Sequence, residues 1–375
     1  MRTNGEKINN SGEGLRILIA PLDWGLGHAT RCIPIIYALK NAGVTVFLAG
    51  DGAPEVILKK EFPELPFLHL QGYKIVYSKS KRSFFLKLLS QFPSIFNSIN
   101  NEHKWLKNIV KEHKIDAVIS DNRFGFYHKL IPSVYITHQL HIETGNRFIN
   151  KIAQYLHYSY INRFGNCWVP DAKGNKNLGG LLSHTKKMPL CPVSYLGIIS
   201  RFKKMDIPVI NDLIVVLSGP EPQRTIFEKI IISELRSYNG SAVLVRGLPE
   251  QEDQIILNNN IQVYHYLPAD ELSKKIQQSA MVLSRAGYTT IMDLAILKQK
   301  AILVPTPGQA EQEYLAKNLT QKQLFYSCLQ KNFSLEKSIR EAEKFYNTRQ
   351  FETGYLNETV IINWLTEIKN TKVLQ

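Results

Sequence analysis

The sequence predicts an α/β protein built from two Rossmann-like domains that face each other across a cleft. Three observations support this fold class. The chain has 375 residues, and a soft prior of about 150 residues per domain suggests two domains. Short apolar strands alternate with helical patterns in two series, which begin at Leu15 and Leu213. The stretch between the two series, residues 171–211, is rich in Gly, Pro, Lys and Ser, as is typical of a domain boundary.

These observations set the expected boundaries. Residues 1–14 are polar and predict a disordered leader. Residues 15–200 are expected to form the first domain and residues 201–350 the second. In residues 351–375, apolar side chains recur every fourth position from Val360, so the tail predicts a helix with one apolar face.

The first domain opens with a strand–helix–strand pattern. A strand at Leu15–Ala20 precedes a loop and a helix that ends near Lys40, and a second strand follows at Val44–Ala49. Three further strands of the same sheet are expected at residues 116–120, 133–137 and 167–169, the last of which would be the final strand of the sheet.

The second domain contains the clearest motif of the chain. Met281–Leu283 predicts a strand, residues 284–287 a turn, the apolar residues from Ile291 a helix, and Ala301–Val304 another strand. Gly287 allows a ligand to approach the backbone, and the free N–H groups of the helix that follows suit a phosphate. Strand ends in open α/β sheets are where ligands bind.

Charge and cysteine content narrow the function classes. The formal net charge is +14, from 46 Lys and Arg against 32 Asp and Glu, which favours anionic partners. The excess is spread along the chain, so we expect no nucleic-acid partner. The four cysteines are scattered and predict a reducing compartment. With no apolar leader and no run of about 18 apolar residues, we expect a cytoplasmic protein.

Attachment to the inner face of the cytoplasmic membrane stays open because of one basic, aromatic segment. In residues 79–96, lysines and an arginine alternate with phenylalanines and leucines, which predicts a basic amphipathic helix. Such a helix can lie on an anionic membrane surface. It can equally pack on the sheet with its lysines in water, and the pattern does not separate the two.

The motifs of the second domain resemble a known family. Ser-Arg-Ala-Gly at 284–287, Asp293, Pro305 and Gln312-Glu313 are similar to the donor-site signature of GT-B glycosyltransferases, in particular the MurG-like branch. The resemblance implies a GT-B fold, with a last helix that returns to the first domain. It also implies a UDP-sugar donor held by the second domain, no metal or other cofactor, and inversion at the anomeric carbon.

Within that resemblance, Asp293 would accept hydrogen bonds from the ribose hydroxyls of the nucleotide. An alternative is local, because Thr290 to Asp293 also has the spacing of a helix capping box. Gln312 would bind hydroxyls of the donor sugar, with Glu313 beside it, although both also fit an exposed polar helix start.

A phosphate loop is expected at residues 218–224, where two prolines remove N–H donors and Arg224 could supply charge instead. Leu267 occupies the position at which the family holds uracil, and its alternative is an ordinary turn. The expected donor-binding residues are Ser218, Gly219, Arg224, Leu267, Ser284, Arg285, Gly287, Asp293, Gln312 and Glu313.

The loop after the first strand is the expected catalytic element. Gly27-His28 resembles the family's Gly-His loop, so His28 would act as general base on an acceptor hydroxyl. Asp23 would orient His28 or take that role itself, and packing or capping is the alternative for His28. The expected acceptor-binding residues are Gly27, Arg31, Asp121, His138, Gln139 and Asn146.

The predicted function is metal-independent transfer of a sugar, GlcNAc or another hexose, from a UDP-sugar to an acceptor hydroxyl. The acceptor would be a sugar, lipid-linked or part of the cell envelope. No Asp-x-Asp or HExxH motif is present, so no metal site is expected. Two alternatives stay open: a UDP-sugar epimerase on the same fold, and a non-catalytic protein that binds nucleotide-sugars.

Overall fold

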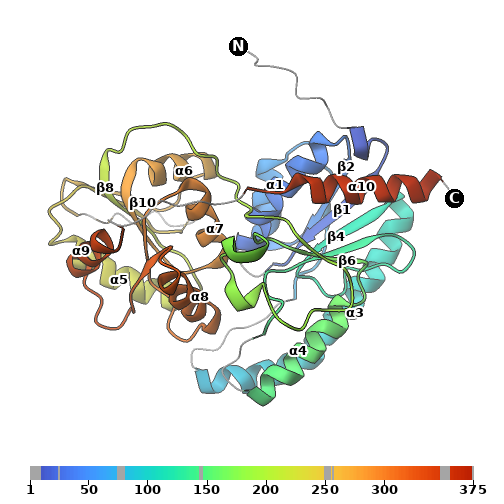
Figure 1. Ribbon diagram of the computed structural model, residues 1–375, viewed down its shortest axis with the longest axis horizontal. Coiled ribbons are helices and arrows are strands. Elements are labelled where there is room, and N and C mark those ends of the chain that lie inside the picture. Colours follow the sequence, from blue (N-terminus) through green and yellow to red (C-terminus); the bar gives the residue numbers. More distant parts are fainter. Residues whose placement is uncertain are drawn as a thin grey trace, which may run out of the picture. The chain divides into compact units, whose positions relative to one another are not determined.

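The computed structural model describes residues 10–23, 26–73, 81–142, 147–248, 255, 257–346 and 355–373, without the side chains of residues 10, 26, 81–93, 147 and 373. The chain forms two compact units (Figure 1). The N-terminal unit comprises residues 1–175, 181–199 and 356–375. The C-terminal unit comprises residues 176–180 and 200–355.

The N-terminal unit is built on a parallel sheet of seven strands in the order β3-β2-β1-β4-β5-β6-β7. These strands are β1 (Arg16–Pro21), β2 (Thr45–Gly50), β3 (Phe67–His69), β4 (Ala117–Asp121), β5 (Ser133–Ile136), β6 (Asn166–Val169) and β7 (Val193–Tyr195). From β1 the chain first builds outward through β2 and β3, and then returns to place β4 on the other side. The boundary between β1 and β4 is therefore a topological switch point, where open α/β sheets bind ligands.

Helices cover both faces of this sheet, because successive strand residues point to opposite sides. Apolar residues of α1 (Leu26–Asn41), α2 (Gly52–Glu61) and α10 (Glu358–Val373) share one core with side chains such as Ile17 and Ile119. On the other face, α3 (Lys81–His113) and α4 (Arg147–Ile161) each pack on part of the sheet.

The last helix, α10, packs on the N-terminal unit, as the predicted GT-B fold requires. Figure 1 shows it in red beside the blue α1, and the two helices are in contact. Its residues Ile361, Trp364, Leu365 and Ile368 are buried in the core that α1 also lines. The ring of Trp364 lies 5.2 Å from that of Trp168 on β6, edge to face.

The C-terminal unit has a parallel sheet of six strands in the order β10-β9-β8-β11-β12-β13. These strands are β8 (Asn211–Val216), β9 (Ala242–Val245), β10 (Ile261–Tyr264), β11 (Ser279–Ser284), β12 (Ala301–Leu303) and β13 (Tyr326–Ser327). Its helices are α5 (Gln223–Leu235), α6 (Ala269–Gln277), α7 (Tyr288–Leu297), α8 (Ala310–Gln321) and α9 (Leu335–Tyr346). The switch point of this sheet lies between β8 and β11.

Several expectations about the fold need correction. The first sheet does not end at residues 167–169, because β7 pairs with β6 beyond them. The short strands β3 and β13 also escaped the sequence analysis. Residues 10–12 of the expected disordered leader form a 3-10 turn, η1 (Asn10–Gly12), in contact with α10, while residues 1–9 lie outside the described residues. Two further 3-10 turns, η2 (Gly174–Lys176) and η3 (Gly180–Leu182), lie in the expected boundary region.

The basic segment at residues 79–96 is helical from Lys81 onward, as predicted. Farther along α3, Ile99 and Leu106 are buried against the N-terminal unit, so this part of the helix packs on the sheet. Residues 79 and 80 lie outside the described residues. None of the helices that the structure describes is long and apolar enough to cross a membrane.

Candidate functional site

The N-terminal unit gathers polar side chains at the switch point between β1 and β4. His28 and Arg31 lie in the first turns of α1, Asp121 is the last residue of β4, and His138 follows β5. Because the carboxyl ends of parallel strands meet at one edge of the sheet, these side chains come together although 110 positions separate the first from the last.

Asp121 is the centre of this cluster and is completely buried. Its Oδ2 accepts a hydrogen bond of 2.7 Å from Arg31 Nε, and its Oδ1 accepts one from Arg31 Nη2. Arg31 also donates to Nδ1 of His28 and to Nδ1 of His138, both at 2.9 Å. Burial would raise the pKa of Asp121, but the attraction of Arg31 and His28 outweighs it and lowers the pKa. Asp121 therefore stays ionised at neutral pH.

His28 has two possible neutral forms in this cluster. Arginine can only donate, so the contact from Arg31 requires a lone pair on Nδ1 and leaves the hydrogen on Nε2. In the other tautomer, Nδ1 carries the hydrogen and faces Asp121 Oδ1 at 3.3 Å, which leaves Nε2 able to take a proton. Burial and the charge of Arg31 both lower the pKa of His28, so the neutral forms prevail at pH 7. The second form is the one that can act as a base.

Asp23 does not orient His28, contrary to one of the expectations. Its Oδ1 accepts from the backbone N–H of Tyr73 at 3.3 Å and lies 3.9 Å from Nη1 of Arg123. The buried Arg123 in turn donates from Nε to Glu102 on α3. The carboxylate that contacts His28 is Asp121, which the sequence analysis had assigned to acceptor binding.

The other expected acceptor residues are placed as follows. The carbonyl of Gly27 accepts a hydrogen bond of 3.1 Å from the Thr30 hydroxyl, within the first turns of α1. Gln139 follows β5 and its carbonyl contacts Nε2 of His157 at 2.8 Å. Asn146 lies outside the described residues. Contact of any of these residues with an acceptor stays a prediction.

In the C-terminal unit, Asp293 lies on α7 and is held by a residue that the sequence did not suggest. Its Oδ1 accepts a hydrogen bond of 2.5 Å from the hydroxyl of Ser200, at the start of this unit. The capping-box interpretation is wrong, because the N-cap of α7 is Gly287 and makes no side-chain cap. Burial raises the pKa of Asp293 to about 6, although Arg201 and Ser200 act in the opposite direction.

The expected phosphate loop follows β8, at the switch point of this sheet. Ser218 and Gly219 are exposed, and Gly219 has a φ of +102°, which favours glycine. Arg224 is already engaged, because it donates to Glu221 at 2.6 Å and to Glu228 at 3.3 Å. It is therefore held away from the role of a mobile phosphate ligand.

Gln312 and Glu313 lie in the first turn of α8, and both side chains bind back to the loop between β12 and α8. Gln312 Oε1 accepts from the backbone N–H of Thr306 at 2.8 Å, and Glu313 Oε1 accepts from that of Gly308 at 2.7 Å. These contacts fix the loop that carries both side chains. Contact of either residue with a donor sugar stays a prediction.

The remaining expected donor residues lie at or beyond the carboxyl ends of strands in the C-terminal sheet. Ser284, the last residue of β11, and Arg285 are both 1% exposed, and Gly287 begins α7. Leu267 is buried just before α6. Gly287 has a φ of −74°, which any residue adopts, so only its missing side chain distinguishes it.

A further polar group was missed by the sequence analysis. Arg246 follows β9, donates from Nε to Glu228 at 2.6 Å and contacts Nδ1 of His265 at 3.0 Å. Neither Arg246 nor Glu228 belongs to a recognisable motif, so only the fold brings them together.

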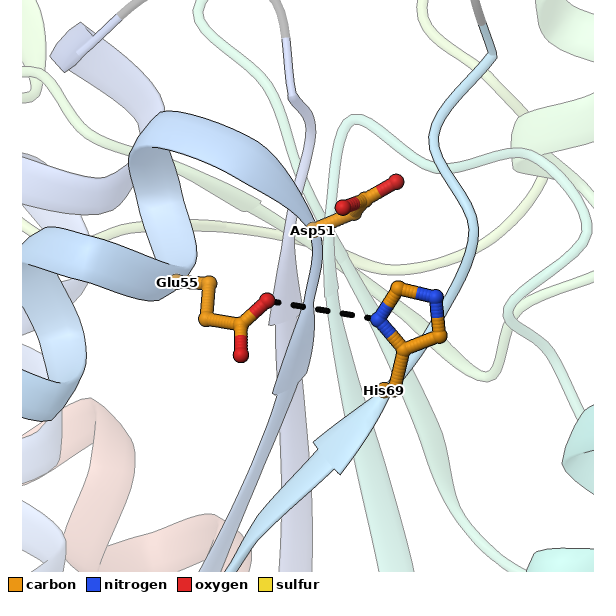
Figure 2. Close-up of side chains that lie close together, drawn as sticks. All are labelled: Asp51, Glu55 and His69. Carbon is orange, nitrogen blue, oxygen red and sulfur yellow. Dashed lines mark ion pairs between the residues drawn. The ribbon is translucent and has the colours of Figure 1, made fainter.

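The sequence predicts no metal site, and among the described residues one group has suitable spacing. Ligand atoms of Asp51, Glu55 and His69 lie within 4.8 Å of one another (Figure 2). Asp51 follows β2, Glu55 lies in the first turn of α2, and His69 ends β3. Glu55 Oε1 is already paired with Lys59 at 2.6 Å, and the His69 side chain is 68% exposed. Such exposed groups commonly occur without a metal, so the arrangement carries no assignment.

Comparison with known proteins identifies similar enzymes. Residues 222–355 match the Glycosyltransferase family 28 C-terminal domain. The UDP-N-acetylglucosamine--N-acetylmuramyl-(pentapeptide) pyrophosphoryl-undecaprenol N-acetylglucosamine transferase of Clostridium tetani is 26% identical over 297 residues, with 76% of each chain covered.

Solved structures share the fold at low sequence identity. MurG of Acinetobacter baumannii is 13% identical, with a TM-score of 0.53 over 94% of this chain and 99% of that one. UGT2 of Phytolacca americana is 13% identical, with a TM-score of 0.59 over 95% and 94%. The kitacinnamycin glycotransferase is 12% identical, with a TM-score of 0.64 over 96% and 95%.

Two parallel α/β units, a returning C-terminal helix and these similarities define a glycosyltransferase of the GT-B fold. The sequence relative from Clostridium tetani indicates a subgroup of this class. Within this class, the chain is similar to the MurG-type transferases.

Proposed function

We propose that this enzyme transfers a hexose, GlcNAc or another, from a UDP-sugar to the hydroxyl of a lipid-linked acceptor of the cell envelope. The name of the Clostridium tetani relative states a UDP-GlcNAc donor and an acceptor on pyrophosphoryl-undecaprenol. The observation that carries the proposal is the matched C-terminal domain, whose expected donor residues gather at one edge of a parallel sheet.

The C-terminal unit would hold the nucleotide. Asp293 has a second carboxylate oxygen beside the one that Ser200 occupies, and an ionised carboxylate can accept from both ribose hydroxyls. Ser218 and Gly219 would meet the diphosphate at the switch point, and Gln312 with Glu313 would contact the donor sugar. Ser284, Gly287 and Leu267 would shape the same site through backbone groups.

The N-terminal unit would supply the base. In the tautomer with hydrogen on Nδ1, His28 donates to Asp121 and its Nε2 can take the proton of the acceptor hydroxyl. The oxygen then attacks the anomeric carbon, and the bond from that carbon to the UDP oxygen breaks. Asp121 stabilises the imidazolium that forms, and Arg31 holds Asp121 in place.

A membrane surface is the expected location of a lipid-linked acceptor, and α4 offers a second observation in its favour. Phe148, Ile152 and Tyr155 are 72%, 48% and 75% exposed and lie on one face of that helix, with Lys151 among them. Tyr160 of α4 packs against the same small cluster as Ile95 of the basic helix α3. Apolar side chains next to basic ones fit a surface of anionic lipid.

Vesicle sedimentation tests the membrane part of the proposal. The chain should sediment with vesicles that contain anionic lipid at low salt, and the double variant Phe148→Ser, Tyr155→Ser should sediment less. Leu329→Ser, at a residue 70% exposed in the C-terminal unit, is the matched control and should behave like the wild type. Equal sedimentation of the double variant and the wild type would remove α4 from the contact.

The transfer itself is tested by the release of UDP from UDP-GlcNAc and UDP-glucose, with and without a polyprenyl-linked sugar. Acceptor-dependent release is the expected result. Conversion of the sugar nucleotide without any acceptor would instead indicate an epimerase. Binding without turnover would indicate a non-catalytic nucleotide-sugar-binding protein.

A further inference from the structure

Arg285 is a buried cation that has no counter-charge in the part of the chain that the structure describes. Its side chain is 1% exposed, directly after β11. Nη1 donates to the carbonyls of Val304 and Pro305 at 3.3 and 3.4 Å, and Nη2 donates to the carbonyl of Gln223 at 3.0 Å. Nε has no hydrogen-bond partner among the described residues. Burial alone lowers the pKa of Arg285 to about 10, with no contribution from any carboxylate.

Two other buried arginines of the C-terminal unit form ion pairs with carboxylates. Arg224 is paired with Glu221 and Glu228, and Arg246 is paired with Glu228. Within the described residues, the guanidinium of Arg285 contacts carbonyl oxygens and the ring of Phe227, whose centroid lies 4.1 Å from it, but no carboxylate. A buried charge is costly unless it is paired, so an unpaired one indicates that a partner arrives from outside the chain.

Two more buried polar atoms without partners lie around the same place. The Thr306 hydroxyl, 1% exposed, and Gln223 Oε1 make no hydrogen bond within the described part of the chain. A Cβ built on Gly219 would lie 3.8 Å from that hydroxyl, so Thr306 adjoins the turn between β8 and α5. The orphaned atoms therefore lie at the switch point of the sheet, where α5 begins.

This turn is poor in backbone donors. Pro220 and Pro222 lack N–H groups, and the N–H groups of Arg224 and Thr225 already bond to Pro220 O and Glu221 Oε2. An anion at this turn would find few of the N–H groups that a glycine-rich phosphate loop provides. A fixed positive charge beneath the turn and a hydroxyl beside it can replace them.

We propose that Arg285 is the fixed counter-charge for the diphosphate of the nucleotide-sugar, and that the Thr306 hydroxyl donates a hydrogen bond to a phosphate oxygen. Arg285 is a positioning residue here. It does not touch the ligand, and it acts through the turn between β8 and α5, since it donates to the carbonyl of Gln223 where α5 begins. The inference rests on the proposed function, because it takes a nucleoside diphosphate sugar as the ligand.

The charge would matter in the reaction as well as in binding. When the anomeric carbon–oxygen bond breaks, its electron pair stays on the β-phosphate oxygen, and the acceptor's proton goes to His28. UDP thus leaves with one more negative charge than it carried in the donor. A buried cation stabilises that charge without a bound metal.

The test separates the charge from the fold by comparing UDP with uridine. Arg285→Met should weaken the binding of UDP by about 100-fold, as expected for a charge several ångströms away in a partly screened site. It should leave uridine binding unchanged, because uridine has no phosphate. Arg285→Lys should restore part of the UDP affinity. Arg340→Met, at an exposed arginine of the same unit, is the control and should match the wild type. Both affinities are measured by calorimetric titration.

Equal loss of UDP and uridine affinity, or unchanged UDP affinity, would overturn the proposal. If Arg285→Met does not fold, Thr306→Val takes its place and should weaken UDP by about 10-fold while sparing uridine, as expected for one lost hydrogen bond to a charged group. An unchanged ratio of the two affinities in Thr306→Val would then overturn it. If the wild type binds no nucleotide at all, the donor site itself is refuted, which is a different outcome.

Discussion

Replacing Asp293 by Asn should make the ligand-free protein more stable and its nucleotide site weaker. Burial raises the pKa of this carboxyl from 3.8 to about 6. Between these two values the folded state holds a proton that the unfolded state has lost, so the free energy of unfolding falls as the pH rises through this window. One pKa unit corresponds to about 1.4 kcal/mol, so the ionised carboxylate costs up to about 3 kcal/mol above pH 7.

Asn removes this cost because it does not ionise, and its Oδ1 can still accept from Ser200. Since Asp293 is partly accessible, solvent reduces the gain, and we expect about 1–3 kcal/mol at pH 7.5. For a unit of this size the melting temperature should rise by roughly 2–4 °C per kcal/mol. At about pH 4 the difference should largely disappear, since Asp293 is then neutral in the folded state.

The same variant should bind uridine about 10- to 100-fold more weakly, because Asn carries an NH2 group, which cannot accept a hydrogen bond, in place of the second carboxylate oxygen, and has no charge. Uridine affinity of the wild type should fall below about pH 6, as Asp293 takes up a proton. Uridine is preferred to UDP here because a phosphate also titrates near pH 6.

Thermal unfolding at pH 4 and 7.5 and calorimetric titration with uridine test both halves of this prediction. Asp206→Asn, at an exposed carboxylate of the same unit, is the control and should change neither quantity. A variant that is no more stable than the wild type at pH 7.5, or one that keeps full uridine affinity, would refute the reasoning.

Three further predictions concern the base, the metal requirement and the returning helix. His28→Gln should lower kcat by roughly 10²- to 10⁴-fold with unchanged UDP affinity in calorimetry. Because burial and Arg31 lower the pKa of His28 from its ordinary value of 6.5, the wild-type kcat should fall on acidification with a midpoint below pH 6.5, where the base becomes protonated. A midpoint at pH 7.5 would contradict this. EDTA should leave the rate of UDP release unchanged, and a loss that Mg²⁺ or Mn²⁺ restores would contradict metal independence. Trp364→Ala should cost about 3–5 kcal/mol of unfolding free energy, measured in urea, because it leaves a cavity beside Trp168, whereas Trp364→Phe should cost much less.

The long, strongly patterned elements could be predicted from the sequence, and the short ones could not. The buried strands β1, β2 and β8 and the helices that follow them are set by local hydrophobic runs. Strands β3 and β7 have three residues each and β13 has two, too few for a periodic pattern. They are strands because a neighbouring strand supplies their hydrogen bonds.

Site residues that belong to a local motif could be predicted from the sequence, and contacts between distant positions could not. The loop at His28 and the residues around Asp293 carry local signatures, so a resemblance could point to them. The contacts of Asp121 with His28 and of Ser200 with Asp293 each join positions 93 residues apart, and no local pattern encodes them. The capping-box interpretation of Asp293 failed because α7 begins at Tyr288, so Thr290 lies inside the helix and not at its N-cap.

The most direct test of the central claim is UDP release from UDP-GlcNAc with a polyprenyl-linked sugar acceptor, measured for the wild type and for His28→Gln. We expect acceptor-dependent release by the wild type, and a loss of at least about 100-fold in the variant while its UDP affinity is retained. Release that does not depend on an acceptor, or a variant as fast as the wild type, would contradict it.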